Sequence, residues 1–148
     1  MLLNLIMEDF VTFEIAKKLK EKGFMEKCFL HYEATGGVYS NSIDTYDRPN
    51  QELDYSDFLK CHNGGNSIGL IDRPTIPQVL KWLREEKKYH IEFVGNACGY
   101  LFIVSDVPSE GGTDRYCSDY SGPNDGGTWD NFEDCAIAGI EYVLDNLI

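Results

Sequence analysis

The segment PTIPQVLKWLREEKKYHIEFVGNACGYLFIVSDV (residues 74–107) contains the most regular pattern in the chain and indicates how it folds. Its first half is typical of an amphipathic helix, because apolar residues recur at every third or fourth position. Thr75 is expected to cap this helix, with Pro77 in its first turn and Gln78 completing a capping box. The predicted apolar face contains Ile76, Val79, Leu80 and Leu83, and the charged face Lys81, Arg84, Glu85 and Lys88.

The second half of the segment predicts a β-hairpin. Residues 90–95 and 99–107 are rich in the β-branched and aromatic residues that strands favour. Residues 96–99 lie between them, so we expect an antiparallel pair joined by a loop of about four residues or slightly longer. A hairpin alone is only marginally stable, so helices packed across it would be needed to complete the fold.

A further helix is predicted towards each end of the chain. In the first, Thr12 is the expected N-cap, and Gly23 with Phe24 is the expected Schellman end. The last is expected to begin at about Asp130, with Glu133 completing its capping box, and to continue to the C-terminus. Their apolar stripes are Ile15, Ala16 and Leu19 in the first helix, and Ala136, Ile140, Val143, Leu144 and Leu147 in the last.

Between the first and second helices the pattern is less regular. Residues 27–34 are typical of a strand, whereas turn residues crowd residues 35–73. A long structureless segment is unusual in a compact domain, so short strands or a helical turn are expected there, the turn around residues 54–60. The complete order predicts a single α+β domain over residues 1–148, with about three helices packed on a small, mainly antiparallel sheet and two long loop regions.

Three segments carry a resemblance to a protein family: VTFEIAKKLKEKGF (11–24), PTIPQVLKWLREEKKYHI (74–91) and AGIEYVLDNLI (138–148). They resemble a widespread family of small uncharacterised proteins from gut-type bacteria, their phages and mobile elements. The resemblance implies an origin of that kind, and it transfers no activity, cofactor or site residue to this chain. Residues 35–73 and 109–129 lie outside the matching segments, so a function specific to this chain is expected there.

The charge of the chain is unevenly distributed. Its net charge is −12 over 148 residues, and residues 96–148 contain ten acidic residues and one basic residue, Arg115. An acidic surface repels the phosphate backbone of nucleic acids, so direct nucleic-acid binding is not expected. The same surface attracts positive charge, and the predicted partner is therefore a basic protein.

Cysteine usage and hydropathy predict a cytoplasmic protein without a membrane span. The five cysteines are odd in number and irregularly spaced, which is a poor pattern for a disulfide framework. The N-terminal MLLNLIM has no basic residue and only a short apolar run, so no signal peptide is expected, and Met7 is an alternative start. No apolar run approaches the length of a transmembrane helix.

The Asp- and Gly-rich stretch SEGGTDRYCSDYSGPNDGGTWDNFED (residues 109–134) suggests a calcium loop. An EF-hand needs oxygen ligands at fixed positions around a central glycine, and no register of this stretch supplies them all. An irregular calcium site formed by Asp114, Asp119 and Asp125 is the alternative, and a solvated loop without a metal is the interpretation we favour.

Other chemical motifs are equally incomplete. Cys28 and His31 have zinc-ligand spacing, but the adjacent Cys61 and His62 would point to opposite faces of a strand. Residues 64–69 have the glycine spacing of a phosphate-binding loop without its lysine. No local signature of a nucleophile is present either. The sequence therefore predicts no metal, no cofactor and no catalytic residue.

Aromatic residues in the two loop regions predict binding surfaces, and these residues are Tyr39, Tyr46, Tyr55, Tyr116, Tyr120 and Trp129. They lie among Asp, Asn, Ser and Gly, a composition that binding loops use to gain contact area at low entropic cost. The alternative is that these rings cover the edge of the core and hold a long loop in place. The predicted partner-binding residues are Tyr116, Tyr120, Trp129, Asp114, Asp119 and Asp125.

These observations favour a non-catalytic acidic protein that binds a basic macromolecular partner through its loop face, the surface of residues 106–134. Its expected role is that of a phage or mobile-element accessory protein. The alternative is a small enzyme, or a ligand- or carbohydrate-binding domain, with a cleft between the hairpin and the long loops. A deep pocket with converging polar groups would support that alternative.

Overall fold

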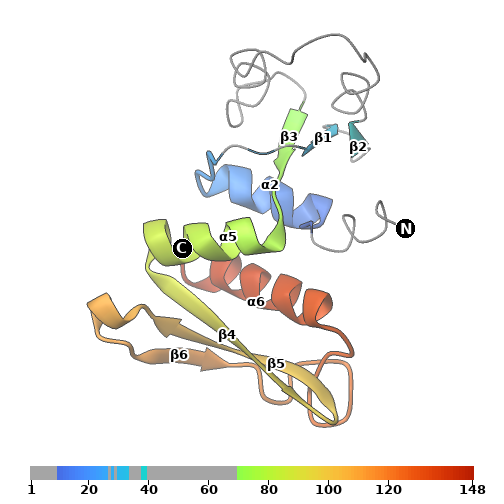
Figure 1. The fold of residues 1–148 in the computed structure, drawn as a ribbon, viewed down its shortest axis with the longest axis vertical. Coiled ribbons are helices and arrows are strands. Elements are labelled where there is room, and N and C mark those ends of the chain that lie inside the picture. The colour runs from blue at the N-terminus through green and yellow to red at the C-terminus, as the bar shows by residue number, and fades with distance from the viewer. Residues whose placement is uncertain (1–9, 27, 29, 34–37, 40–69) are drawn as a thin grey trace, which may run out of the picture. The chain divides into compact units, whose positions relative to one another are not determined.

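The computed structural model describes residues 10–26, 28, 30–33, 38–39 and 70–148 of the chain (Figure 1). It shows an α+β protein with three α-helices and antiparallel sheets among these residues, which confirms the predicted fold class. The chain divides into two compact units, Val11–Pro74 and Met1–Phe10 with Thr75–Ile148. That residues 1–148 form one domain stays a prediction.

The smaller unit begins with helix α2 (Phe13–Glu21), whose two ends are the ones predicted. The Thr12 hydroxyl accepts a hydrogen bond from the Ile15 N–H at 3.3 Å, as an N-cap does. At the other end Gly23 adopts φ +83, and the Phe24 N–H donates to the Leu19 carbonyl at 2.9 Å. This is the predicted Schellman motif.

The sheet of the smaller unit has the order β2 (Val38–Tyr39), β1 (Leu30–Glu33), β3 (Leu70–Arg73), with both pairs antiparallel. The strand predicted at 27–34 is therefore confirmed over β1, and short strands lie at both ends of the predicted irregular region. Tyr32 is buried, and its hydroxyl donates to the Val11 carbonyl at 2.6 Å. The helical turn expected around residues 54–60 lies outside the described residues.

The larger unit begins with helix α5 (Ile76–Trp82), which a π-helical turn, η1 (Leu83–Lys87), extends. The Thr75 hydroxyl accepts from the Gln78 N–H at 3.3 Å, so the predicted N-cap is confirmed. Lys88 then adopts a left-handed conformation, φ 65, and ends the helix. Ile76, Val79 and Leu83 are buried as predicted, and Trp82 is a further buried residue that the predicted stripe omitted.

Strands β4 (Tyr89–Asn96) and β5 (Gly99–Asp106) form the predicted antiparallel hairpin. Their pairing extends to Asn96 opposite Gly99, so residues 97 and 98 alone make the turn. The predicted loop of about four residues was therefore wrong. Two local features allow the tighter turn: the Asn96 side chain accepts from the Cys98 N–H at 2.8 Å, and Gly99 adopts φ +129.

The predicted long loop after the hairpin contains ordered elements, which corrects the interpretation of residues 109–129. A short 3-10 helix, η2 (Pro108–Glu110), is followed by β6 (Asp114–Cys117), which pairs antiparallel with β5. The sheet order is β4-β5-β6, with a bulge between Val104 and Ser105. The free edge of β5 offers N–H and C=O groups that need partners, and β6 supplies them.

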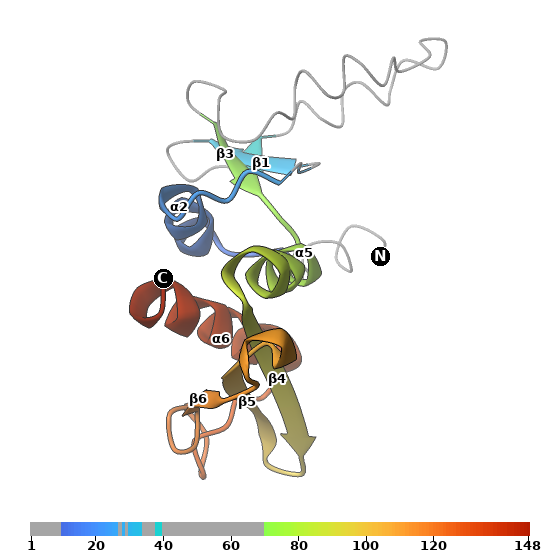
Figure 2. The same ribbon diagram turned by 90° about the vertical axis from the view of Figure 1, so that its left-hand side faces the viewer.

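Helix α6 (Phe132–Asn146) lies along one face of this sheet, as Figures 1 and 2 show. The helix lies close to the sheet at Gly139, where an added Cβ would meet Ile91 Cγ2 at 3.2 Å and Phe102 Cγ at 3.3 Å. The predicted stripe of α6 faces the core, with Ala136, Ile140, Val143 and Leu144 buried.

The N-cap of α6 differs from the prediction by one residue. Asn131 rather than Asp130 accepts the capping hydrogen bond, from the Asp134 N–H at 2.8 Å. The Asn131 amide also donates to the Asp134 carboxylate at 3.0 Å. Asp130 instead accepts from the Asn124 side chain at 2.6 Å.

Candidate functional site

The segment that follows β6 is attached to β5 at two points. Ser118 exchanges two hydrogen bonds with Phe102: its N–H donates to the Phe102 carbonyl at 2.9 Å, and its hydroxyl accepts from the Phe102 N–H at 2.8 Å. Trp129 and Tyr100 donate backbone N–H groups to each other's carbonyls at 2.9 and 2.8 Å. Residues 119–128 therefore form a loop with both ends anchored on one strand, and we call it the Tyr120 loop.

Hydrogen bonds within the Tyr120 loop define its backbone. The Gly122 N–H donates to the Gly127 carbonyl at 2.8 Å, and the Gly127 N–H donates to the Asn124 carbonyl at 2.8 Å. The Asn124 N–H donates to the Thr128 carbonyl at 3.0 Å, and the Thr128 hydroxyl donates to the Cys98 carbonyl at 2.6 Å. The last bond ties the loop to the turn of the hairpin.

Tyr120 has an unusual conformation and an unusual environment. Its φ is +66, a left-handed value that costs a non-glycine residue about 1–2 kcal/mol. The residue is 87% exposed, so packing of the ring does not offset this cost. The backbone of Tyr120 instead lies against Gly127, where a Cβ would overlap the backbone atoms of Tyr120. The loop thus presents an aromatic ring to solvent on a backbone that its neighbours hold in place.

The other two aromatic residues predicted as partner-binding lie against the core. Tyr116 is half-buried and stacks on Tyr142 of α6, with ring centroids 3.8 Å apart. Trp129 is also half-buried, with its ring centroid 5.6 Å from that of Phe102. These two rings hold the loop face onto the core, as the alternative interpretation expected. Whether either also contacts a partner stays a prediction.

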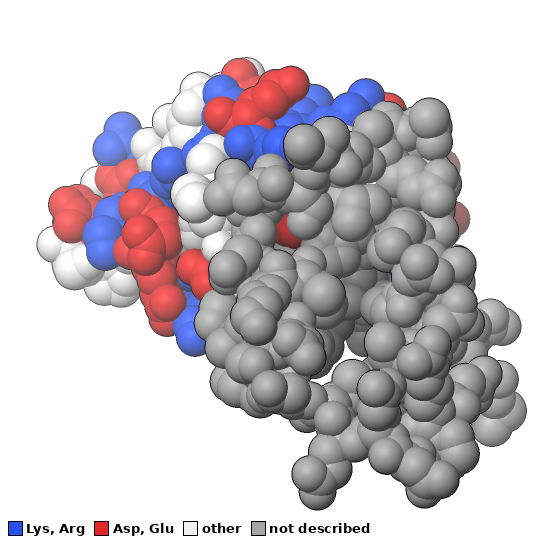
Figure 3. All heavy atoms as spheres, turned by 90° about the horizontal axis from the view of Figure 1, so that it is seen from above, with Lys and Arg blue, Asp and Glu red and all other residues white. Residues whose placement is uncertain are grey.

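The carboxylates predicted as partner-binding are all exposed. Asp114 begins β6, and Asp119 and Asp125 belong to the Tyr120 loop. Residues 106–134 contain eight acidic residues and one basic residue. In the view of Figure 3, basic and acidic side chains are interspersed over the described residues.

The basic residue within residues 106–134 is already paired. Arg115 donates two hydrogen bonds to Asp106, from Nε to Oδ1 at 2.9 Å and from Nη2 to Oδ2 at 2.6 Å. The hydrogen bonds to Arg115 hold the pKa of the Asp106 carboxyl below its usual value. Because the pair with Asp106 neutralises Arg115 locally, no other basic side chain within residues 106–134 balances the carboxylates of the Tyr120 loop.

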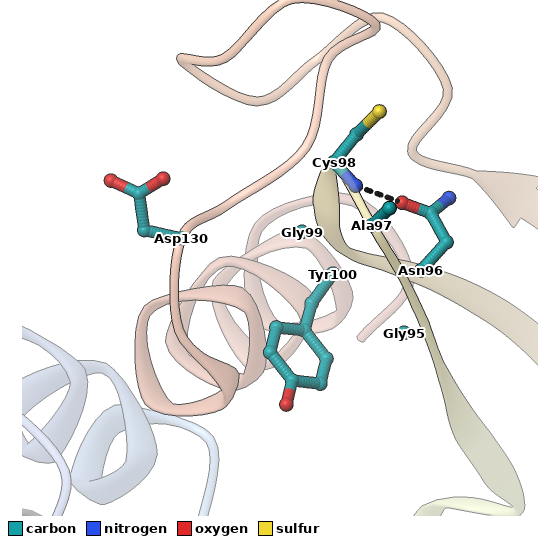
Figure 4. Close-up of a pocket in the computed structure, with 7 residues that line it drawn as sticks. All are labelled: Gly95, Asn96, Ala97, Cys98, Gly99, Tyr100 and Asp130. Carbon is teal, nitrogen blue, oxygen red and sulfur yellow. Dashed lines mark hydrogen bonds between the residues drawn. The ribbon is translucent and has the colours of Figure 1, made fainter.

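A shallow depression of about 510 Å³ lies beside the turn of the hairpin (Figure 4). It is the place where the alternative interpretation expected a cleft, and it is lined by Gly95, Asn96, Ala97, Cys98, Gly99, Tyr100 and Asp130. The Cys98 thiol, the Tyr100 hydroxyl and the Asp130 carboxylate point in different directions rather than towards one point. Catalysis or tight binding of a small ligand requires converging groups, and this depression does not provide them.

The described residues give no geometry for the metal sites considered from the sequence. Within residues 70–148 and the described part of the smaller unit, no three His, Cys, Asp or Glu side chains are grouped to hold an ion. The Asp114, Asp119 and Asp125 trio is therefore not brought together. Cys28 is buried, and burial together with nearby Asp72 raises the pKa of its thiol. The Cys61–His62 pair lies outside the described residues.

Comparison of the chain with protein-family models, curated proteins and solved structures gives no match. None of the helices in the described residues is long and apolar enough to span a membrane.

Proposed function

We propose that this chain is a non-catalytic protein that binds a basic macromolecular partner through the Tyr120 loop. The observation that carries the proposal is Tyr120 itself, an 87% exposed ring on a left-handed backbone that Gly127 and the hydrogen bonds of the loop hold in place. Strained residues with little packing of their own are concentrated at functional positions. A tyrosine has few rotatable bonds, so on a preordered backbone it loses little conformational entropy on binding.

The chemistry around Tyr120 favours a partner rich in arginine or lysine. A guanidinium group stacks on the face of a tyrosine ring, and neighbouring carboxylates can accept its hydrogen bonds. Asp119 directly precedes Tyr120, and Asp125 is exposed in the same loop. The excess of acidic residues across 106–134 would also accelerate encounter with a positively charged protein.

In this proposal the half-buried rings position the loop, and Tyr120 is the first contact. The Tyr116 hydroxyl shares a hydrogen bond with the Ser121 hydroxyl at 2.8 Å, which fixes the residue next to Tyr120. The Tyr116–Tyr142 stack then links this part of the loop to α6. A role as a cytoplasmic accessory protein of a phage or mobile element is part of the proposal and is supported by the resemblance of residues 11–24, 74–91 and 138–148.

The test is a selection from a random peptide display library, with the purified chain as bait. We expect the selected peptides to be rich in Arg and Lys and their affinity to fall with added salt, because attraction between exposed charges is screened. Tyr120→Ala should lower the affinity for the selected peptides about tenfold or more. Tyr120→Phe, which keeps the ring, should bind them nearly as well as wild type.

Matched variants separate a local effect from one of net charge. Asp119→Asn with Asp125→Asn removes two exposed acids from the loop, and Glu21→Gln with Glu26→Gln removes two exposed acids from the smaller unit. Only the first pair should weaken binding strongly. Selection of acidic peptides, or equal binding by wild type and Tyr120→Ala, would refute the proposal.

A further inference from the structure

Among the described residues, strand β4 forms an edge of the larger sheet. In the sheet order β4-β5-β6 it pairs with β5 on one side, and no described strand pairs with its other side. It is long for an edge strand, continuous from Tyr89 to Asn96, and contains neither a proline nor a bulge. Proteins usually protect edges by shortening, bulging or charging them. The opposite edge, β6, follows that rule, because it is short, pairs next to a bulge and begins with Asp114 and Arg115.

The register of the hairpin shows which backbone groups of β4 point outwards. Tyr100 lies opposite Gly95 and directs its own N–H and C=O to Trp129, away from β4. Gly95 and Tyr100 are therefore a non-hydrogen-bonded pair, and such pairs alternate along an antiparallel ladder. It follows that Tyr89, Ile91 and Phe93 also direct their N–H and C=O groups to the outer edge.

We propose that a second copy of this chain pairs with this edge, β4 against β4, antiparallel about a two-fold axis at Ile91. This register places His90 opposite Glu92 of the second copy, and the symmetry repeats the pair. It also places Tyr89 opposite Phe93 of the second copy. The imidazole N–H can donate to the carboxylate, and hydrogen-bonded and aromatic cross-strand pairs both stabilise antiparallel sheets.

The neighbouring symmetric registers are less complementary. An axis at Phe93 would place Glu92 opposite Val94. An axis at Tyr89 would pair little of the two strands, because β4 begins at Tyr89 and Lys88 before it is left-handed. The Ile91 register instead pairs residues 89–93 of both copies, all of which belong to β4. Specificity for one register follows from the His90–Glu92 and Tyr89–Phe93 pairs.

The charge around β4 permits self-association in spite of the net charge of −12. Residues 74–95 contain three acidic and four basic residues, whereas residues 96–148 contain ten acidic residues and one basic residue. The Tyr120 loop is anchored on the side of β5 that faces away from β4. The β4 pairing and partner binding by the Tyr120 loop thus use opposite sides of the sheet, and either can fail without the other.

Sedimentation equilibrium over a range of concentrations tests the proposal. The wild-type chain is expected to show a monomer–dimer equilibrium. Glu92→Lys should weaken the dimer about tenfold or more, because it changes both symmetric pairs, and His90→Lys should tighten it. Glu110→Lys makes the same charge change at an exposed residue of η2 and should leave the equilibrium as it is. A wild-type chain that stays monomeric, or a Glu92→Lys dimer as stable as wild type, would refute the proposal.

Cysteine cross-linking tests the register. In a background with Cys61→Ser, Cys98→Ser and Cys117→Ser, oxidation of a mixture of His90→Cys and Glu92→Cys chains should give a covalent dimer of one chain of each kind. Each variant alone should give much less covalent dimer. In this register residue 90 of one copy lies opposite residue 92 of the other copy, so two identical variants do not bring their new cysteines together. Preferential self-linking of either variant would contradict the axis at Ile91.

Amide hydrogen exchange identifies the occupant of the edge. Protection of the Ile91 and Phe93 amides should rise with protein concentration if a second copy covers them. Protection that is independent of concentration would mean that another part of the same chain, or a bound peptide, covers β4, and would overturn the proposal.

Discussion

Tyr116 of β6 and Tyr142 of α6 stack with ring centroids 3.8 Å apart and an angle of 14° between their planes. In the register of the sheet, Tyr116 lies opposite Val104, a buried residue of β5. Its side chain is therefore on the face of the sheet that α6 covers. The stack connects the last strand to the last helix and, through the Tyr116–Ser121 hydrogen bond, connects both to the Tyr120 loop.

The energetic coupling of this pair is measurable. Aromatic pairs contribute about 0.5–1.5 kcal/mol beyond the area they bury, so a double-mutant cycle of Tyr116→Leu and Tyr142→Leu should give a coupling of about 1 kcal/mol. Chemical unfolding of the four proteins measures it. Strictly additive losses of unfolding free energy would show that the stack contributes only burial.

Two adjacent glycines of the Tyr120 loop provide a matched comparison. Gly126 and Gly127 have similar left-handed φ values of +82 and +71, so alanine at either should cost about 1–2 kcal/mol. A Cβ at Gly126 has no atom within 4 Å, whereas a Cβ at Gly127 overlaps the backbone of Tyr120. Gly127→Ala should therefore destabilise the protein by at least about 1 kcal/mol more than Gly126→Ala. It should also lower the affinity for any ligand that contacts Tyr120. Equal unfolding free energies for the two variants would contradict this packing.

The elements that the sequence predicted well are those with local signals. Thr12, Gly23 and Thr75 cap helices through hydrogen bonds to residues within one turn, so the sequence around them is sufficient. The short strand β6 has no such signal. Its flanks are rich in turn residues, and its partner is an edge of β5 that only the folded hairpin provides. The same is true of the Trp129–Tyr100 pairing, which connects residues far apart in sequence.

The roles of the residues in the candidate site also could not be predicted from local sequence alone. Tyr116 and Tyr120 are identical in type and near each other in sequence, yet one is stacked on α6 and the other is 87% exposed. The difference follows from the strand register at Tyr116 and from the left-handed backbone at Tyr120. Composition predicted that aromatic and acidic residues gather here, but only the fold separates the rings that support the loop from the ring that is exposed.

The start of α6 distinguishes two neighbouring cap candidates. Asn131 accepts the hydrogen bond from the Asp134 N–H, whereas exposed Asp130 bonds to the Asn124 side chain. Asn131→Ala should therefore lower the unfolding free energy by about 1 kcal/mol, and Asp130→Ala by less than about 0.5 kcal/mol, as is usual for exposed positions. Thermal unfolding of both variants is sufficient. A larger loss of unfolding free energy for Asp130→Ala than for Asn131→Ala would show that Asp130 is the cap.

The Asp106–Arg115 pair should make stability depend on pH. The hydrogen bonds from Arg115 lower the pKa of Asp106 in the folded protein, so its contribution is complete above the unfolded-state pKa, near 3.8, and is lost as pH falls through the lower folded-state value. Asp106→Asn should be less stable than wild type near neutral pH, and the difference should shrink in acid. Asp114→Asn, at an exposed neighbouring carboxylate, is the control and should show a smaller difference. A difference for Asp106→Asn that stays constant into strong acid would contradict the coupling.

Thiol reactivity should follow burial among the four cysteines that the structure describes. Cys98 in the hairpin turn and Cys117 at the end of β6 are exposed, whereas Cys28 and Cys135 are buried. Burial raises the pKa of the Cys135 thiol to about 11, so near neutral pH it is both inaccessible and protonated. Brief alkylation of the native protein, followed by peptide mass spectrometry, should label Cys98 and Cys117 first and reach the buried pair only after denaturation. Labelling of Cys135 as fast as that of Cys98 would mean that α6 detaches from the sheet readily, because Cys135 lies in the first turn of that helix.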